Sequence, residues 1–198
     1  MAKLTVVQDP PLSRLLFNDT RTAIVWFLLR LYVGWAWLDA GLHKIQDPAW
    51  METGKAIQGF WTRAAAVPPP PARPPITYDW YRGFLQFLLE SETHVWFGKL
   101  IAVGETLIGV ALIIGIFTGF AALIGAFMNM NFMLAGTASI NPVLLVLAIG
   151  ILMAWKVAGI IGVDRFLLPA LGTPWRPAPP ERAARSPSPP ATRGMIGR

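Results

Sequence analysis

Four apolar runs of about 20 residues each dominate the chain and limit what it can fold into. They lie at residues 22–42, 98–117, 119–138 and 142–163. At a rise of about 1.5 Å per residue, each run makes a helix that can cross the roughly 30 Å hydrocarbon core of a bilayer. Only 14% of the residues are charged and 54% are hydrophobic, which leaves too little polar surface to cover a soluble globule of this size. The sequence therefore predicts an all-α integral membrane protein.

The links between the runs predict how the helices are arranged. Residues 115–119 and 137–142 join the last three runs, and such short links force neighbouring helices to run antiparallel. We therefore expect a four-helix transmembrane bundle with up-down topology over residues 22–167. Residues 1–21 form a separate N-terminal segment, and residues 168–198, rich in proline, alanine and arginine, are expected to be a disordered basic tail.

Lysine and arginine near the helix ends predict the orientation, because cytoplasmic flanks of membrane helices are enriched in these residues. The terminal flanks carry Lys3, Arg14, Arg21, Arg165, Arg176, Arg182, Arg185, Arg193 and Arg198. The loop at 43–97 has as many acidic as basic residues. We therefore expect a multi-pass protein of a cell membrane, with both termini cytoplasmic and loop 43–97 extracytoplasmic. The basic excess forms no stripe that a nucleic acid could follow, so no nucleic-acid partner is expected.

The long loop carries helical patterns of its own. Two sets of apolar residues recur at helical spacing: Trp50, Ile57, Phe60, Trp61 and Ala64, and then Trp80, Phe84, Phe87 and Leu88. Residues 68–75, which are mostly proline, form a stiff spacer between them. The pattern indicates two short amphipathic helices at the outer membrane interface. They form either an ordinary aromatic belt or a cap over a site between the membrane helices.

Polar residues inside the apolar runs are the main candidates for a functional site, because each is costly in lipid and needs a partner or water. Arg30, Gly34, Trp37 and Gly41 share one face of the first helix, and Asp39 lies on the opposite face. In the second helix, Glu105 shares a face with Gly98 and Gly109, and the third helix adds Asn129 and Asn131. We predict an Arg30–Glu105 pair. It either fixes the helix register or belongs to a polar pocket for a quinone headgroup, a proton or a small substrate.

The residue types also limit the cofactors. The chain has no cysteine, which excludes disulfides, iron–sulfur clusters and thiol catalysis by this chain. Its two histidines, His43 and His94, fall at the outer ends of the first and second helices. A bis-histidine haem, or a metal held by His43, Asp39 and Asp47, is disfavoured, because so few histidines are more often interfacial polar residues. No haem or metal is expected, and a quinone contact for one of the histidines is preferred to a haem.

Motifs spread over all four helices resemble those of the DoxX/DoxD family of bacterial and archaeal membrane proteins. They are Arg30 to Gly34, Gly41 to Lys44, Gly104-Glu105 with Gly109, Gly115 and Thr118, Asn129 to Asn131, and Gly162 to Arg165. The resemblance covers residues 22–167. It implies a four-helix membrane subunit with redox associations. DoxD-type members are the membrane subunit of a thiosulfate:quinone oxidoreductase, whereas other members look like anchors for sulfur-handling or oxidative-stress proteins.

From the residues and the resemblance together, we expect the quinone-facing membrane subunit of a complex that oxidises thiosulfate or a related sulfur compound, inactive alone. A redox partner would dock on residues 43–97. The expected catalytic residues are Glu105, Arg30 and Asp39, and the expected quinone-binding residues are His43, Trp37, Asn129 and Asn131. The alternative is a non-catalytic anchor or accessory subunit of a redox, respiratory or photosynthetic complex. A transporter is disfavoured, because there are no inverted repeats or broken helices.

Overall fold

The computed structural model describes residues 9–173, and this part of the chain is helical throughout, with no strand. The predicted all-α class is confirmed. The α-helices are α1 (Pro11–Asn18), α2 (Ala23–Gln46), α3 (Pro48–Met51), α4 (Lys55–Ala65), α5 (Asp79–Glu90), α6 (His94–Ile114), α7 (Thr118–Leu134), α8 (Asn141–Met153), α9 (Trp155–Ala158) and α10 (Asp164–Ala170). A 3-10 turn, Thr20–Thr22, leads into α2.

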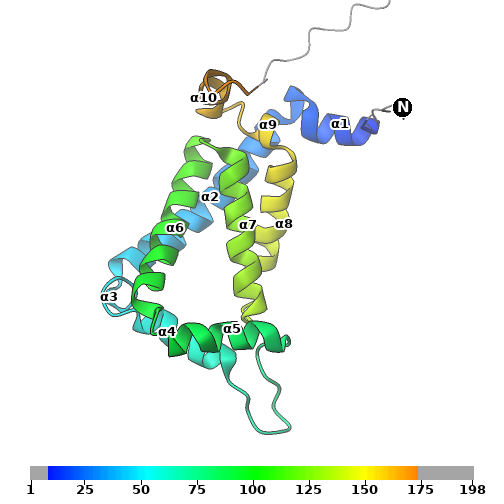
Figure 1. The fold of residues 1–198 in the computed structure, drawn as a ribbon. Coiled ribbons are helices and arrows are strands. Elements are labelled where there is room, and N and C mark those ends of the chain that lie inside the picture. The colour runs from blue at the N-terminus through cyan, green and yellow to red at the C-terminus, as the bar shows by residue number, and fades with distance from the viewer. Residues whose placement is uncertain (1–8, 174–198) are drawn as a thin grey trace, which may run out of the picture.

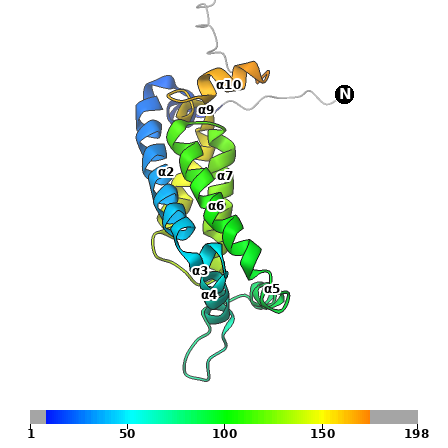
Figure 2. The ribbon, with the colours of Figure 1, turned by 90° about the vertical axis from the view of Figure 1, so that its left-hand side faces the viewer.

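Four of these helices, α2, α6, α7 and α8, lie side by side and form the body of the protein (Figures 1 and 2). Helices α2 and α6 are long and apolar enough to cross a membrane, judged by length and composition. Helices α7 and α8 are shorter, with 17 and 13 residues. The fourth predicted run is divided because the backbone leaves helical geometry at Ala154, so α8 and α9 share it. That all four helices cross the bilayer stays a prediction.

The outer surface of the body is apolar. Large side chains from all four helices are exposed on it, among them Trp35, Leu107, Phe120 and Val146, each more than 60% exposed. A soluble monomer rarely exposes apolar surface this extensive, because water penalises it. Lipid is the solvent that fits such a surface, in agreement with the apolar composition.

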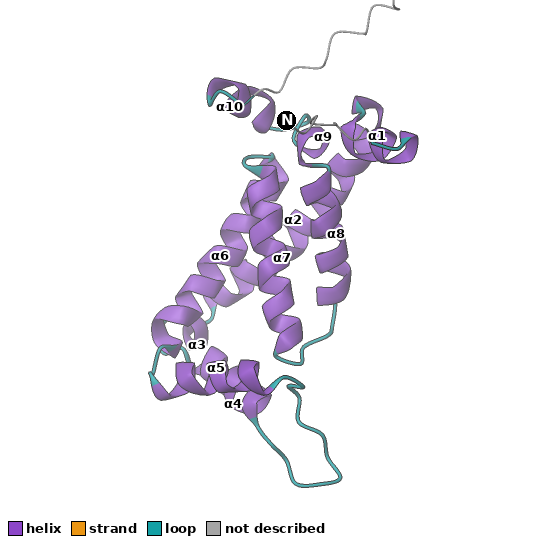
Figure 3. Ribbon diagram, turned by 45° about the vertical axis from the view of Figure 1, so that its right-hand side comes forward, coloured by secondary structure: helices purple, strands orange, loops and turns teal. Residues whose placement is uncertain are grey.

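Loop 43–97 folds into a helical layer across one end of the body. The segment between α2 and α6 is shorter than the predicted loop, because α2 continues to Gln46 and α6 already begins at His94. Helices α3, α4 and α5 lie at this end, whereas α1, α9 and α10 lie at the opposite end (Figure 1). The two amphipathic helices correspond to α4 and α5, and the proline-rich connection between them projects away from the body (Figure 3).

Helix α5 is apolar on two sides. Trp80, Phe84 and Phe87 share a face, as their spacing predicts, but this face is exposed. The adjacent side packs instead, and Leu88, predicted to belong with these aromatics, is buried on it with Tyr81 and Leu85. It joins a cluster with Ile57 and Trp61 of α4; the buried members are Ile57, Trp61, Ala64, Ala65, Ile76, Tyr81, Leu85, Leu88, Ile101 and Ala135. An exposed aromatic face beside a packed one suits a helix at a membrane interface.

The predicted tail boundary at residue 168 falls inside α10, which continues to Ala170. Residues 1–8 and 174–198 lie outside the described part of the chain, so the predicted disorder of the tail applies mostly to residues that the structure does not describe.

Candidate functional site

The centre of the candidate site is an ion pair between α2 and α6. Lys44, in the last turn of α2, donates a hydrogen bond to the Glu105 carboxylate, with Nζ 2.6 Å from Oε2. The Glu105 residue is 1% exposed, and the Lys44 ammonium also lies 5.3 Å from the ring centroid of Trp50. A buried carboxylate in an apolar bundle needs such a counter-ion, because an isolated charge there is strongly disfavoured.

Two glycines let the helices approach closely enough for this pair. A Cβ on Gly41 would lie 2.5 Å from the Thr106 backbone nitrogen, and a Cβ on Gly109 would collide with the backbone of Leu38. The backbones of α2 and α6 therefore touch at Thr106, next to Glu105, and again at Gly109, one helical turn further along α6. Small residues have this role where membrane helices pack.

The predicted Arg30–Glu105 pair is wrong. Arg30 is fully buried, but its Nη2 donates to the Ile161 carbonyl oxygen at 2.5 Å, and its guanidinium lies against Gly115. Arg30 precedes Lys44 by 14 positions, about 21 Å along a helix, so it lies near the opposite end of the bundle from Glu105. No flexible side chain spans that distance. The predicted shared face of Arg30, Gly34, Trp37 and Gly41 is correct, since all four are buried.

Arg30 belongs to a second polar cluster, which ties the C-terminal part of the body to the α6–α7 turn. Asp164, also fully buried, accepts hydrogen bonds from the backbone nitrogens of Phe117 at 2.6 Å and Thr118 at 2.8 Å. The carboxylate thereby caps the N-terminus of α7, where unpaired N–H groups favour negative charge. Arg30 Nε and Nη1 have no hydrogen-bond partner among residues 9–173, so this cluster satisfies the guanidinium only in part. We take the Lys44–Glu105 pair as the candidate site because a cavity adjoins it.

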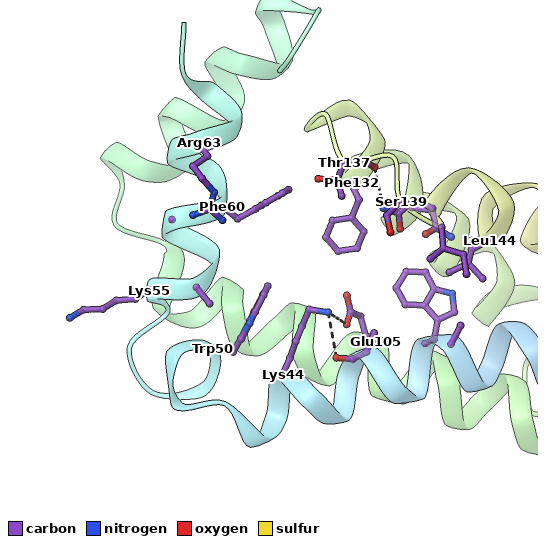
Figure 4. Close-up of a pocket in the computed structure, with 18 residues that line it drawn as sticks. Lys44, Trp50, Lys55, Phe60, Arg63, Glu105, Phe132, Thr137, Ser139 and Leu144 are labelled. Atoms are coloured by element: carbon purple, nitrogen blue, oxygen red, sulfur yellow. Dashed lines mark hydrogen bonds and ion pairs between the residues drawn. The ribbon is translucent and has the colours of Figure 1, made fainter. Parts of the chain in front are cut away.

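Next to that pair lies a cavity of about 570 Å³. Figure 4 shows Lys44 and Glu105 on one side of it, with Phe60 and Phe132 across from them. Its wall comes from α2, α3, α4, α6, α7, α8 and the α7–α8 connection; the lining residues that carry polar side chains are Trp37, Lys44, Trp50, Lys55, Arg63, Glu105, Asn129, Thr137, Ser139 and Asn141. Because α4 closes part of the wall, the loop helices act as a cap over a site between the membrane helices.

Two residues in this wall have buried polar atoms without a hydrogen-bond partner among residues 9–173. They are the indole nitrogen of Trp37, a residue 3% exposed, and both amide atoms of Asn129, which is fully buried. Trp37 Nε1 lies against Gly125, one helical turn before Asn129 on α7, so the two groups are neighbours. Buried polar groups are normally satisfied, and an unsatisfied donor lining a cavity is available to a ligand.

The other predicted residues lie elsewhere. Asp39 and His43 are on the exposed side of α2, where their side chains are 55% and 76% exposed and His43 Nδ1 is 3.6 Å from an Asp39 carboxylate oxygen. Neither lines the cavity. Asn131 faces a different space, where its backbone oxygen and its side-chain oxygen both accept from the Tyr81 hydroxyl, at 2.9 and 3.2 Å. Burial raises the pKa of Tyr81 to about 12, so this hydroxyl stays a donor at neutral pH.

Lys44 is the residue of the candidate site that the sequence analysis named only within a family motif and to which it gave no role. It lies seven positions after Trp37 and three after Gly41, which puts all three on one helix face. Extending the face of Arg30, Gly34, Trp37 and Gly41 by one more turn would have included it. For metals, the described residues contain no group of three or more His, Cys, Asp or Glu side chains close enough to hold an ion.

The chain was compared with protein families, curated proteins and solved structures. The family model DoxX matches residues 25–138, which is 114 of the 198 residues and includes all but the first two residues of α2, the loop layer, α6 and α7. All the residues at the centre of the candidate site, Trp37, Lys44, Glu105 and Asn129, fall within the match. No curated protein and no solved structure matches the chain.

Proposed function

The chain belongs to the DoxX family of membrane proteins, which is often linked to redox and quinone-associated functions, and from this premise we propose that it is the quinone-binding membrane subunit of a redox complex. The complex would oxidise thiosulfate or a related sulfur compound. The observation that carries the proposal is the pair of unpartnered buried groups, Trp37 Nε1 and the Asn129 amide, in a cavity that also holds Lys44 and Glu105.

The donor set fits a quinone headgroup. A quinone ring is flat and apolar, and its two carbonyl oxygens accept hydrogen bonds. The Trp37 indole, the Asn129 amide and the Lys44 ammonium are donors, and the rings of Phe60 and Phe132 form apolar wall beside them. A volume of about 570 Å³ lies within the usual range for small-molecule sites, which combine an apolar wall with a few oriented polar groups.

The Lys44–Glu105 pair suits proton transfer at such a site. A bound quinone supplies an acceptor for two electrons and two protons. Lys44 would donate a hydrogen bond to a carbonyl oxygen of the quinone, and Glu105, which Lys44 contacts at 2.6 Å, would hold or pass a proton next to it. We assign Asp39 and His43, which lie on the exposed side of α2, to proton exchange at the outer surface.

The electrons come from a partner in this proposal, because the chain has no cysteine with which to bind sulfur covalently. A partner that oxidises the sulfur compound would dock on the layer formed by α3, α4 and α5. Lys55 and Arg63 lie at the α4 side of the cavity, and Lys55 points away from the Lys44–Glu105 pair (Figure 4). Such exposed basic groups favour an acidic partner surface.

The test is a titration of the purified full chain with a benzoquinone that has no side chain. Binding is measured as the change in fluorescence of the cavity tryptophans. We expect Asn129→Leu, which keeps the branched shape of the side chain but removes its hydrogen-bonding groups, to weaken binding about tenfold, the value of one buried hydrogen bond of about 1.4 kcal/mol. The matched control is Gln86→Leu, which removes an exposed amide on α5. Absence of binding, or equal affinity in Asn129→Leu and the unaltered chain, would rule the proposal out.

A non-catalytic anchor is the alternative, and the exposed aromatic face of α5, with Trp80, Phe84 and Phe87, favours it as a partner surface. In that case Lys44 and Glu105 only stabilise the bundle. Glu105→Gln would then lower the melting temperature, no quinone would bind, and partner recruitment would depend on the α5 aromatics instead.

A further inference from the structure

A second cavity, of about 380 Å³, lies between α5, α4 and the middle of α6 and α7. Its wall is almost wholly apolar and aromatic. Its side chains with polar atoms are Trp61, Tyr81 and Asn131. Tyr81 and Asn131 are already satisfied, because the Tyr81 hydroxyl donates to Asn131 and the Asn131 amide nitrogen donates to the Phe127 carbonyl oxygen. A space lined in this way accepts an apolar group and has nothing to offer a polar one.

The two cavities share part of their wall. Phe60 of α4 and Phe132 of α7 line both, and their rings meet edge to face, with centroids 6.4 Å apart. Figure 4 shows the two rings on the side of the polar cavity opposite Lys44 and Glu105. One layer of aromatic side chains therefore separates the polar space from the apolar one, and both phenylalanines are only partly buried. A ligand that occupies both spaces therefore requires one of these rings to rotate about its side-chain bonds.

The apolar cavity reaches the outer surface of the body. Phe84, Leu100 and Phe127 line it from α5, α6 and α7, and these three side chains are 42%, 56% and 65% exposed. They belong to the apolar surface that fits lipid. The space thus opens sideways toward the hydrocarbon phase, next to the interfacial helix α5, and its other side meets the polar cavity.

We propose that the two cavities hold one amphipathic ligand: a long-chain quinone with its head beside Lys44, Trp37 and Asn129 and its apolar tail between α5, α6 and α7. The tail passes between Phe60 and Phe132 and leaves toward the bilayer. This inference rests on the proposed function and narrows its ligand to a lipid-soluble quinone that enters from the membrane.

Gly104 allows a direct test. It lines the apolar cavity but not the polar one, and a Cβ placed on it would meet only the Met128 sulfur, at 4.0 Å. Gly104→Leu therefore fills the tail space without a backbone clash. The matched control is Gly83→Leu on α5, where an added Cβ has no atom within 4 Å and no cavity is lined. Both changes replace a helical glycine by leucine, so their effects on helix stability are alike.

The full chain in lipid nanodiscs is titrated with two probes, a benzoquinone without a side chain and the same head with a ten-carbon chain. Gly104→Leu is expected to weaken binding of the ten-carbon probe at least tenfold and to leave the tailless probe within twofold, while Gly83→Leu changes neither. Partition of the long probe into lipid is the same for every variant, so the difference between variants reports on the protein alone.

A second variant keeps the test decisive if Gly104→Leu does not fold. Leu100→Trp enlarges a half-exposed wall residue and should act in the same direction. Equal affinity of the ten-carbon probe in the unaltered chain and both variants overturns the inference. If the tailless probe also fails to bind the unaltered chain, the proposed function fails as well.

Discussion

Glu105 is a buried carboxylate whose charge is balanced by one lysine. Lys44 reaches it from the end of a neighbouring helix, with a side chain that is 20% exposed, whereas the carboxylate is 1% exposed. Such a pair does not by itself make a protein more stable than apolar residues would. Losing one partner is nevertheless costly, because the other charge stays buried and unpaired.

Lys44→Met is therefore expected to lower the free energy of unfolding by about 3 kcal/mol, the lower end of the range for breaking a buried pair. Thermal unfolding in detergent measures the change. The double variant Lys44→Met/Glu105→Gln should recover most of the loss, because it leaves no buried charge. Lys99→Met, on the exposed side of α6, serves as the control and should have little effect. A full loss that persists in the double variant would contradict this account of the pair.

The packing of α2 on α6 sets the position of this pair. Gly41 and Gly109 bring the two backbones together, and the contact fixes how far one helix is shifted along the other. Helical spacing predicted which residues share a face, and it was correct for Arg30, Trp37 and Gly41. Helical spacing contains no information on how far one helix is shifted along another. For this reason Arg30 was assigned to Glu105 in place of Lys44.

Gly109→Ala is expected to separate α2 and α6, because the new methyl group would overlap the backbone nitrogen and Cα of Leu38. Overpacking of this kind costs about 1–3 kcal/mol. The melting temperature should fall, and the Lys44–Glu105 pair should loosen, so adding Lys44→Met should cost less than it does alone. Gly104→Ala on the same helix, with its Cβ 4.0 Å from the Met128 sulfur, is the control and should not be destabilised. Equal melting temperatures for the two alanine variants would contradict the close approach.

The protein as a whole is polarised along the bundle axis. The capped turn at Asp164, with α1, α9 and α10, lies at one end, and the ion pair, the polar cavity and the α3–α5 layer lie at the other (Figure 1). The site is therefore predicted to face the extracytoplasmic side, where a partner protein and the outer surface of the bilayer meet.

The absence of native cysteine permits a clean test of this orientation. Gly83→Cys on α5 and Arg14→Cys on α1 place single thiols at exposed positions of opposite ends. In intact cells, a membrane-impermeant maleimide should label the first and not the second. After permeabilisation both should react. Labelling of both positions, or of the Arg14→Cys variant alone, in intact cells would overturn the predicted topology.

Local periodicity was sufficient to place α2, α6 and α7, the shared face of Arg30, Trp37 and Gly41, and the glycines at the α2–α6 contact, because each of these follows from the geometry of a single helix. It did not predict the break at Ala154 or the side of α5 that packs. The closure of the cavity by α4 and the choice of Lys44 as the partner of Glu105 depend on how separate helices dock, whereas periodicity had already placed Asp39 on the side of α2 opposite Trp37 and Gly41. Docking is decided by close contacts such as Gly109 on Leu38, which join residues that are distant in the chain and have no signature in any one run.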